Sequence, residues 1–364
     1  MQPVSQQMDG IRSQHLGLGL GLMMLAMTVG AILVLSQIRP PGSDFQVYYA
    51  TGSKWTSGQT QLYDAASRNF FNAPWTLLVI APISQLPVDT AVSALATLSI
   101  ACLGVSLWLL TDSRPTPIMV LQLATMPVIY LLLTGQIDTI SLLGVAIAYW
   151  AHRRQKALWL GVGFVLMLVK PTNLVLAGTV LLLGMHKWSW INIAKAIGVP
   201  MLFVIASGFV VGFDWITRYI ENYQAFEPID NGTSTLWKWL DSFGVDAKIL
   251  LIPLAIVLIL ILWRHTLKYG LSDWGLATAL ATQFVFTPYA WVYHYVALLP
   301  VQVYLTRRHW TLGLLVYGVA WLPAGHLIAN GQIFGTSDVL IPLLMGVLCW
   351  GLYFSGQRQA TDEA

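Results

Sequence analysis

The sequence is poor in charged residues. Asp, Glu, Lys and Arg make up 10% of the 364 residues, whereas hydrophobic residues make up 56%. Soluble domains carry about 25% charged and about 45 to 50% apolar residues. Too few charges remain to cover a water-facing surface, so the composition excludes a soluble globular protein and predicts a polytopic integral membrane protein whose exterior contacts membrane lipids.

Two further scarcities exclude other kinds of site. The chain has only two cysteines, Cys102 and Cys349, and both lie inside apolar runs without a partner at metal-ligand spacing. They therefore indicate small buried side chains. The net charge of +3 is small and the basic residues are dispersed, which excludes an electrostatic surface for nucleic acid.

What the sequence does contain is long apolar runs. A membrane-spanning helix needs about 20 apolar residues, and such runs lie near 16–38, 88–110, 116–134, 191–212, 247–263, 272–287, 290–305, 311–328 and 337–354. Shorter or interrupted runs at 74–87, 138–152 and 157–186 predict helices buried among others. We expect a single all-α membrane domain over residues 1–364, with about 12 transmembrane helices in a range of about 10 to 13. This count assumes that 74–110 crosses the membrane once, with a break near Pro87; two crossings would shift the later assignments.

The distribution of lysine and arginine predicts the orientation, because cytoplasmic loops are enriched in these residues. Twelve of the 19 fall in one set of loops: Arg12, Arg114, Arg153, Arg154, Lys156, Lys187, Lys195, Arg264, Lys268, Arg307, Arg308 and Arg358. We therefore expect short cytoplasmic tails at both ends of the chain. The long first polar loop, 39–73, and the polar loop 213–245 are expected outside the cell.

The first external loop contains an acid that is a candidate catalytic base. Asp44 follows the first apolar run closely, so it is expected near the boundary between lipid and water. Partial desolvation there raises the pKa of a carboxyl group and makes it a better proton acceptor. The same position also suits an N-cap, since Ser43 or Asp44 precedes a short helix predicted to begin at Phe45. The spacing alone leaves both roles open.

Three other polar segments interrupt apolar runs on the same outer side: Gly135-Gln136-Ile137-Asp138, Lys170-Pro171-Thr172-Asn173 and Pro288 to Tyr295. A lysine between two half-length apolar runs must face protein, water or an anionic group, or else extend from a helix end toward water. His294 by itself is more typical of a hydrogen-bonded core histidine. We expect Asp44, Gln136, Lys170 and His294 to meet at one membrane face.

These segments resemble glycosyltransferase family 87, membrane enzymes of the GT-C fold that include polyprenol-phosphate-mannose-dependent mannosyltransferases. The resemblance rests on Ser43-Asp44-Phe45 through Tyr48-Tyr49, Leu62-Tyr63-Asp64, Ala73-Pro74-Trp75 through Leu86-Pro87, Gly135-Gln136, Lys170-Pro171 and Pro288 to His294, in the family's order. Two positions depart from the family pattern. His294 stands alone where the family often has two adjacent histidines, and Ala73-Pro74 stands where paired prolines are common.

The resemblance implies transfer of a sugar, with mannose the leading candidate, from a polyprenyl-phosphate donor to a hydroxyl of a lipid or glycan acceptor. The transfer would occur at the outer face of the plasma membrane and invert the anomeric carbon. Asp44 would be the catalytic base, and the residues expected to bind substrates are Lys170, His294, Gln136, Tyr48, Tyr49 and Arg68. No metal or other cofactor is required in principle, because the lipid phosphate leaves as an anion.

The alternative functions are a secondary transporter or a flippase for lipid-linked sugars. A transporter would also have about 12 helices and broken spans, but its binding site usually lies near the membrane midplane between internal repeats. In this sequence the polar motifs gather at one face and no two halves look alike. The pattern therefore favours an enzyme.

Overall fold

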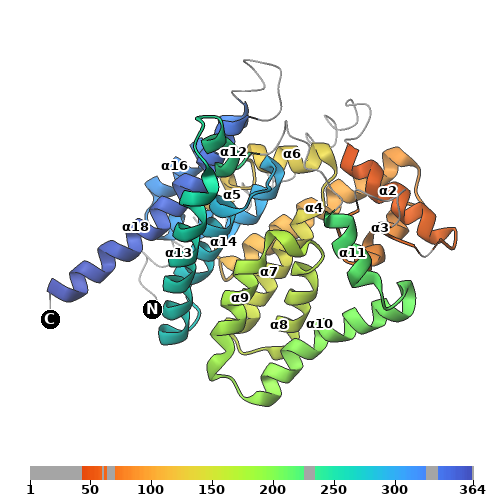
Figure 1. The fold of residues 1–364 in the computed structure, drawn as a ribbon, viewed down its shortest axis with the longest axis horizontal. Coiled ribbons are helices and arrows are strands. Elements are labelled where there is room, and N and C mark those ends of the chain that lie inside the picture. The colour runs from red at the N-terminus through yellow and green to blue at the C-terminus, as the bar shows by residue number, and fades with distance from the viewer. Residues whose placement is uncertain (1–42, 60, 64–69, 225–233, 325–334, 363–364) are drawn as a thin grey trace, which may run out of the picture.

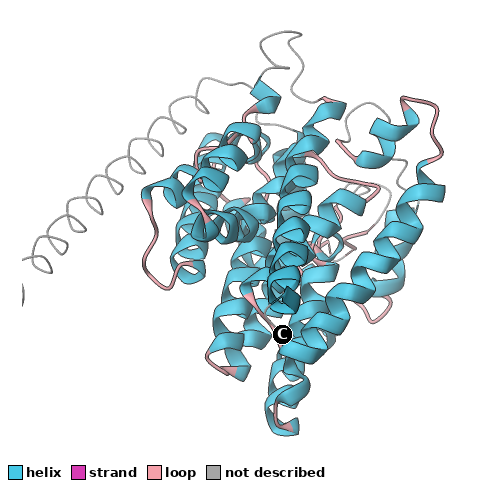
Figure 2. Cartoon of the chain, turned by 90° about the vertical axis from the view of Figure 1, so that its left-hand side faces the viewer, coloured by secondary structure: helices cyan, strands magenta, loops and turns pink. Residues whose placement is uncertain are grey.

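The computed structural model describes residues 43–59, 61–63, 70–224, 234–324 and 335–362, and every regular element in these ranges is a helix (Figure 1; Figure 2). The α-helices are α2 Ser43–Thr56, α3 Leu77–Ile83, α4 Val88–Leu110, α5 Pro117–Leu121, α6 Met126–Thr134, α7 Asp138–Arg153, α8 Ala157–Met167, α9 Val175–Gly184, α10 Trp190–Val211, α11 Trp215–Gln224, α12 Leu236–Asp241, α13 Ala247–Tyr269, α14 Asp273–Phe286, α15 Leu299–Arg308, α16 Trp310–Val319 and α18 Leu340–Asp362. Short 3-10 helices are η2 Pro74–Thr76, η3 Pro171–Asn173, η4 Met185–Lys187, η5 Val292–Leu298 and η6 Thr336–Val339. The all-α prediction is thus confirmed for the described residues, while the apolar run at 16–38 lies outside them.

Five helical segments are long and apolar enough to cross a membrane: Val88–Leu110, Pro117–Thr134, Trp190–Val211, Ala247–Tyr269 and Ser337–Ser355. All five coincide with apolar runs predicted to span. Four apolar helices are shorter: Pro74–Ile83, Ala157–Met167, Val175–Lys187 and Trp310–Ala324. Length and composition therefore support five spans among the described residues, and the total of about 12 stays a prediction.

The region 74–110 contains only one helix of spanning length. α3 has 7 residues, so it is about 10 Å long and cannot cross a hydrocarbon core of about 30 Å. α4 has 23 residues and is long enough. Pro87 is the N-cap residue of α4 and lies between the two helices. This geometry favours a single crossing with a break near Pro87.

Helices α10 and α13 carry an apolar outer surface. Only 17% of the most apolar stretch of each helix is buried inside the protein. Large side chains such as Trp190, Phe209 and Ile249 are 85%, 77% and 70% exposed. A continuous apolar surface of this kind is rare on a protein surrounded by water. Membrane lipid is therefore the environment that covers these helices.

Helix α7 lies at the centre of the bundle, and it has polar residues at both of its ends. Most of its side chains are buried, and it packs against α4, α8 and η5 (Figure 1). Asp138 is its first residue and Arg153 its last, so these residues are separated by about 22 Å along the helix. Arg153 forms an ion pair with Asp112 at 2.7 Å. Arg307 belongs to the same end, because it donates a hydrogen bond to the carbonyl of Leu110.

Candidate active site

A close approach between α2 and the end of α6 places Asp44 beside Gln136. Gly135 ends α6 in the left-handed conformation, with φ of 69°. A Cβ atom on Gly135 would lie 2.6 Å from the Cβ atom of Phe45, which is buried. Only glycine provides both the backbone angle without strain and the space for Phe45. Asp44 directly precedes Phe45 and Gln136 directly follows Gly135, so this contact brings the two residues together.

The interruption between α8 and α9, which contains Lys170, is held by side chains of Asn72 and Trp75. Helix α8 ends at Met167, and the carbonyl groups of Val165 and Val169 accept hydrogen bonds from outside the helix. Trp75 donates its indole N–H to Val165 at 3.0 Å, and Asn72 donates its side-chain amide to Val169 at 3.2 Å. Buried carbonyl groups need such partners where a helix is interrupted. The Ala73-Pro74-Trp75 motif therefore stabilises the end of α8 next to Lys170.

Gln283 of α14 satisfies the backbone on the other side of the same break. Its side-chain oxygen accepts the N–H of Leu176 at 2.8 Å, and its amide nitrogen donates to the carbonyl of Thr172 at 2.9 Å. Thr172 lies in η3 and Leu176 lies in the first turn of α9, and a continuous helix would have paired these two backbone groups internally. Lys170 is thus fixed at an interruption that neighbouring helices support on both sides.

Lys170, Gln136 and Asp138 form a buried polar cluster. The ammonium group of Lys170 lies 2.8 Å from Oδ2 of Asp138 and 2.9 Å from Oε1 of Gln136. Tyr48 donates its hydroxyl to the same Gln136 oxygen at 2.8 Å. Lys170 is 9% exposed and Asp138 is 3% exposed, so the ion pair is shielded from water. A buried ion pair of this kind is costly to break, because either partner alone would be an uncompensated charge.

His294 presents a ring N–H to this cluster. The backbone N–H of Trp291 donates to Nδ1 of His294 at 3.0 Å. We assign the hydrogen of the neutral ring to Nε2 for this reason. That nitrogen lies 3.3 Å from Nζ of Lys170 and 3.8 Å from Oδ1 of Asp138. In this tautomer both Lys170 and His294 are donors, so together they can meet an anion.

Asp44 is a partly buried acid at the edge of the cluster, in the first turn of α2. Its pKa is raised because burial disfavours the charged carboxylate, and the charge of Lys170 and a hydrogen bond with the side chain of Gln136 oppose that rise. The nearby carboxylate of Asp138 raises the pKa of Asp44 further. α2 begins at Ser43, two residues before the predicted start at Phe45. Asp44 therefore lies in the first turn of the helix, and its carboxylate interacts with the side chain of Gln136.

The structure brings five of the predicted site residues together and separates one. Asp44, Tyr48, Gln136, Lys170 and His294 belong to one cluster through the contacts given above. Tyr49 instead donates its hydroxyl to the backbone carbonyl of Leu86 at 2.9 Å, which makes it a link between α2 and the start of α4. Arg68 lies outside the described residues.

Two residues of the cluster were not selected from the sequence. Asp138 is the ion-pair partner of Lys170, and the ring of Tyr293 lies 5.4 Å from the Lys170 ammonium. Asp138 carried a usable signal, because an acid between apolar runs needs a partner of opposite charge. Tyr293 carried none, since tyrosine is common at membrane boundaries. Within the described ranges, no group of three or more His, Cys, Asp or Glu side chains has the geometry to hold a metal ion.

The fold and the cluster define a helical membrane protein whose buried ionisable groups gather at one end of the bundle. The family model of glycosyltransferase family 87 matches residues 70–288. The chain belongs to this family and is a membrane glycosyltransferase, as the sequence motifs predicted. The match contains Gln136, Asp138 and Lys170, whereas Asp44 and His294 lie outside the matched segment. Comparison with curated proteins and with solved structures gives no match.

Proposed function

We propose that this glycosyltransferase transfers a sugar from a polyprenyl-phosphate donor to a hydroxyl of a lipid or glycan acceptor, with Asp44 as the catalytic base. The observation that carries the proposal is the position of Asp44, a partly buried acid with a raised pKa beside the Lys170 and Gln136 side chains. A carboxyl group in that environment is a stronger proton acceptor than one in water. Mannose is the leading sugar because of the resemblance to mannosyltransferases.

In the proposed reaction Asp44 acts on the acceptor hydroxyl, and Lys170 and His294 act on the leaving phosphate. The acceptor oxygen attacks the anomeric carbon while its proton passes to the carboxylate of Asp44. The bond between the anomeric carbon and the phosphate oxygen breaks, and the electron pair leaves with the lipid phosphate. Because attack occurs opposite the leaving group, the anomeric configuration inverts. The reaction needs no redox partner, and Asp44 returns its proton to water after the product leaves.

Lys170 and His294 are proposed to stabilise the leaving phosphate. Both present N–H donors toward the same region, and hydrogen bonds from charged donors to phosphate are the strong ones. Lys170 is already paired with Asp138, so the phosphate would share or replace that carboxylate. With both acids ionised, the cluster holds two negative charges against the one of Lys170. Asp44 therefore repels the donor phosphate, whereas Lys170 attracts it.

The site is proposed to face the outside of the plasma membrane. The cluster lies at the end of α7 that carries Asp138, about 22 Å from the end that carries Arg153. The basic end matches the usual cytoplasmic enrichment in arginine and lysine. A donor embedded in the outer leaflet could then reach Lys170 from the membrane.

The experiment is a transfer assay with purified protein and a panel of radiolabelled polyprenyl-phosphate sugars, followed by extraction of the lipid and glycan products. We expect one sugar donor, most readily polyprenyl-phosphate mannose, to give a labelled product. Asp44→Asn should lower turnover by about 10² to 10⁴-fold, the usual contribution of a general base. Its donor affinity should stay equal or rise, because a repulsive carboxylate has been removed.

The matched control is Asp89→Asn. Asp89 also lies in the first turn of a helix, but it is exposed, so the same chemical change there should leave turnover within about twofold of the wild type. An Asp44→Asn enzyme with normal turnover would remove Asp44 from the mechanism. Absence of product from every lipid-linked donor, with the protein folded, would overturn the proposed donor class.

A further inference from the structure

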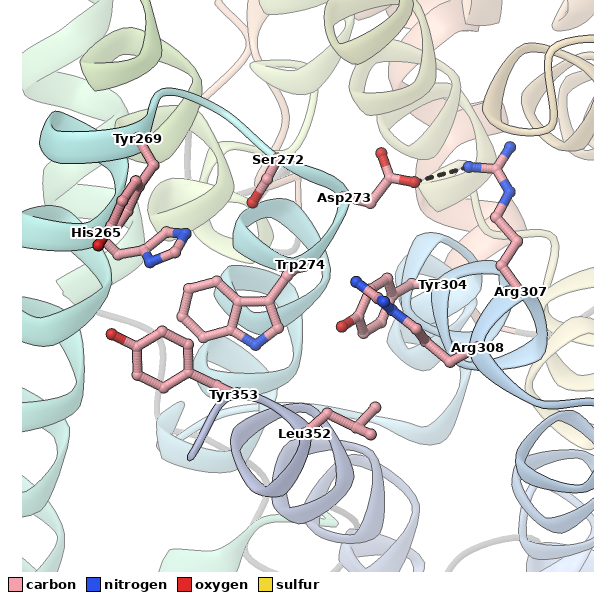
Figure 3. A pocket seen from close by; sticks show the side chains of 10 residues that line it. All are labelled: His265, Tyr269, Ser272, Asp273, Trp274, Tyr304, Arg307, Arg308, Leu352 and Tyr353. Atoms are coloured by element: carbon pink, nitrogen blue, oxygen red, sulfur yellow. Dashed lines mark hydrogen bonds and ion pairs between the residues drawn. The ribbon is translucent and has the colours of Figure 1, made fainter. Parts of the chain in front are cut away.

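A pocket at the opposite end of the molecule from the candidate active site contains basic and aromatic side chains. It has a volume of about 760 Å³ and lies between α13, α14, α15 and α18 (Figure 3). Its lining includes His265, Trp274, Tyr304, Arg307, Arg308 and Tyr353. We call it the basic pocket.

The basic pocket is separate from the cluster around Lys170. Helix α14 runs from Asp273, which lines the pocket, to Phe286, which precedes the segment containing His294. Its 14 residues place these two ends about 20 Å apart. A ligand in the basic pocket therefore cannot contact the groups proposed to carry out transfer.

The two arginines of the pocket differ in their partners. Arg307 forms an ion pair with Asp273 at 2.9 Å and donates to the carbonyl of Leu110 at 2.7 Å. Asp273 also accepts the hydroxyl of Tyr149. Arg308 extends over the ring of Tyr304, with its guanidinium carbon 5.3 Å from the ring centre (Figure 3). Within the described ranges no carboxylate pairs with Arg308, so the pocket holds one positive charge that has no acidic counterpart.

The opposite wall of the pocket is aromatic. The rings of Trp274 and Tyr353 stack with centres 4.4 Å apart, and the ring of His265 meets Trp274 edge-on at 4.5 Å. Trp274 uses its indole N–H to bond the carbonyl of Cys349, so this hydrogen bond is not available to a ligand. Nδ1 of His265 is buried without a hydrogen-bond partner in the described part of the chain. The pocket therefore combines a cation, an unused ring nitrogen and an apolar wall.

We propose that the basic pocket binds the headgroup of an anionic phospholipid. The phosphate would lie against Arg308, and the glycerol and first methylene groups would lie against Trp274 and Tyr353. Basic pockets between membrane helices bind anionic headgroups in this way. A lipid fits better than a soluble phosphate because the pocket lies at the end of α13, a candidate membrane-spanning helix with an exposed apolar surface. The bound lipid's chains would then extend along that surface.

The test is equilibrium binding of lipids to the full-length, delipidated protein in detergent, followed by native mass spectrometry. The probes are dioleoyl phosphatidylglycerol, dioleoyl phosphatidylcholine and the soluble compound glycerol phosphate. We expect the wild type to bind phosphatidylglycerol more tightly than phosphatidylcholine. Arg308→Gln should weaken binding of phosphatidylglycerol about fivefold, the contribution of one basic residue near a membrane surface, without changing binding of phosphatidylcholine.

The matched control is Arg264→Gln, which removes the same charge from an exposed position on α13 outside the pocket lining. It should leave the preference for phosphatidylglycerol intact. Both variants change exposed side chains, so melting temperatures should match the wild type. Equal affinity of the wild type for both lipids, or equal losses from Arg264→Gln and Arg308→Gln, would overturn the proposal. Displacement of the lipid by glycerol phosphate at similar concentrations would assign the pocket to a soluble phosphate compound and overturn it as well.

Discussion

The contact between Gly135 and Phe45 offers a direct test of whether the approach of α2 to α6 sets up the active site. In Gly135→Ala, the new Cβ atom would lie 2.6 Å from the Cβ atom of Phe45. Carbon atoms in contact prefer separations of about 3.5 to 4.0 Å. A Cβ atom is fixed to its backbone, so a change of rotamer cannot relieve the contact. The first turn of α2 must move by about 1 Å, and it carries Asp44 with it.

Two effects of this substitution have separate magnitudes. Alanine at φ of 69° destabilises the fold by roughly 1 to 2 kcal/mol, because the left-handed conformation crowds Cβ against the backbone. The displacement of Asp44 acts on catalysis instead. A misplacement of about 1 Å in a catalytic arrangement can lower the rate about 10²-fold. We therefore expect Gly135→Ala to fold with reduced stability and to lose about two orders of magnitude in turnover.

Gly244→Ala is the control that separates the two effects. Gly244 has φ of 72°, close to that of Gly135, but a Cβ atom there would meet nothing within 4 Å. Initial rates at saturating donor and acceptor, together with melting temperatures, should be measured for both variants. Both should lose stability, Gly135→Ala more than Gly244→Ala because its Cβ atom also displaces α2, and only Gly135→Ala should lose turnover. Equal turnover in the two variants would refute the idea that the Gly135 contact positions Asp44.

Three other predictions concern charge and orientation. Asp44 must be ionised to accept a proton and burial raises its pKa, so kcat/KM should fall as the pH falls through a value above the pKa of an ordinary aspartate. Lys170→Gln should move this fall in kcat/KM to higher pH, and Asp138→Asn should move it to lower pH. If both variants moved it in the same direction, the assignment of the pH dependence to Asp44 would be contradicted. Asp138→Asn should lower the free energy of unfolding by about 3 to 5 kcal/mol, because it removes the ion-pair partner of the buried Lys170. Adding Lys170→Met should recover most of that loss in thermal unfolding, and purely additive losses would argue against the pair. In a cysteine-free background, a cysteine at Gly58 should be labelled only from outside and one at Gly270 only from inside, and the reverse pattern would invert the proposed orientation.

The candidate site was largely predictable because its residues interrupt apolar runs. Gln136, Lys170 and His294 each stand where a spanning pattern breaks, and polar groups at such breaks must find partners inside the protein. Counting the spans between them predicted that they would meet, and the structure brings their side chains together. The sequence pattern could not show which of Tyr48 and Tyr49 contacts the site. The two are adjacent on α2, and only the packed structure shows that one contacts Gln136 and the other the backbone of Leu86.

The sequence by itself determined that the chain is a helical membrane protein of glycosyltransferase family 87. Apolar content, the length of apolar runs and the order of motifs depend only on which residues follow one another along the chain. Only the tertiary structure decided that Lys170 pairs with Asp138, that the side chain of Gln136 interacts with that of Asp44, and that Nε2 of His294 faces the cluster. These contacts depend on how the ends of α6, α7 and α8 meet, and each joins residues from separate helices or loops. Charges buried at such junctions are stabilised by partners that packing brings near, and a linear pattern contains no information about that distance.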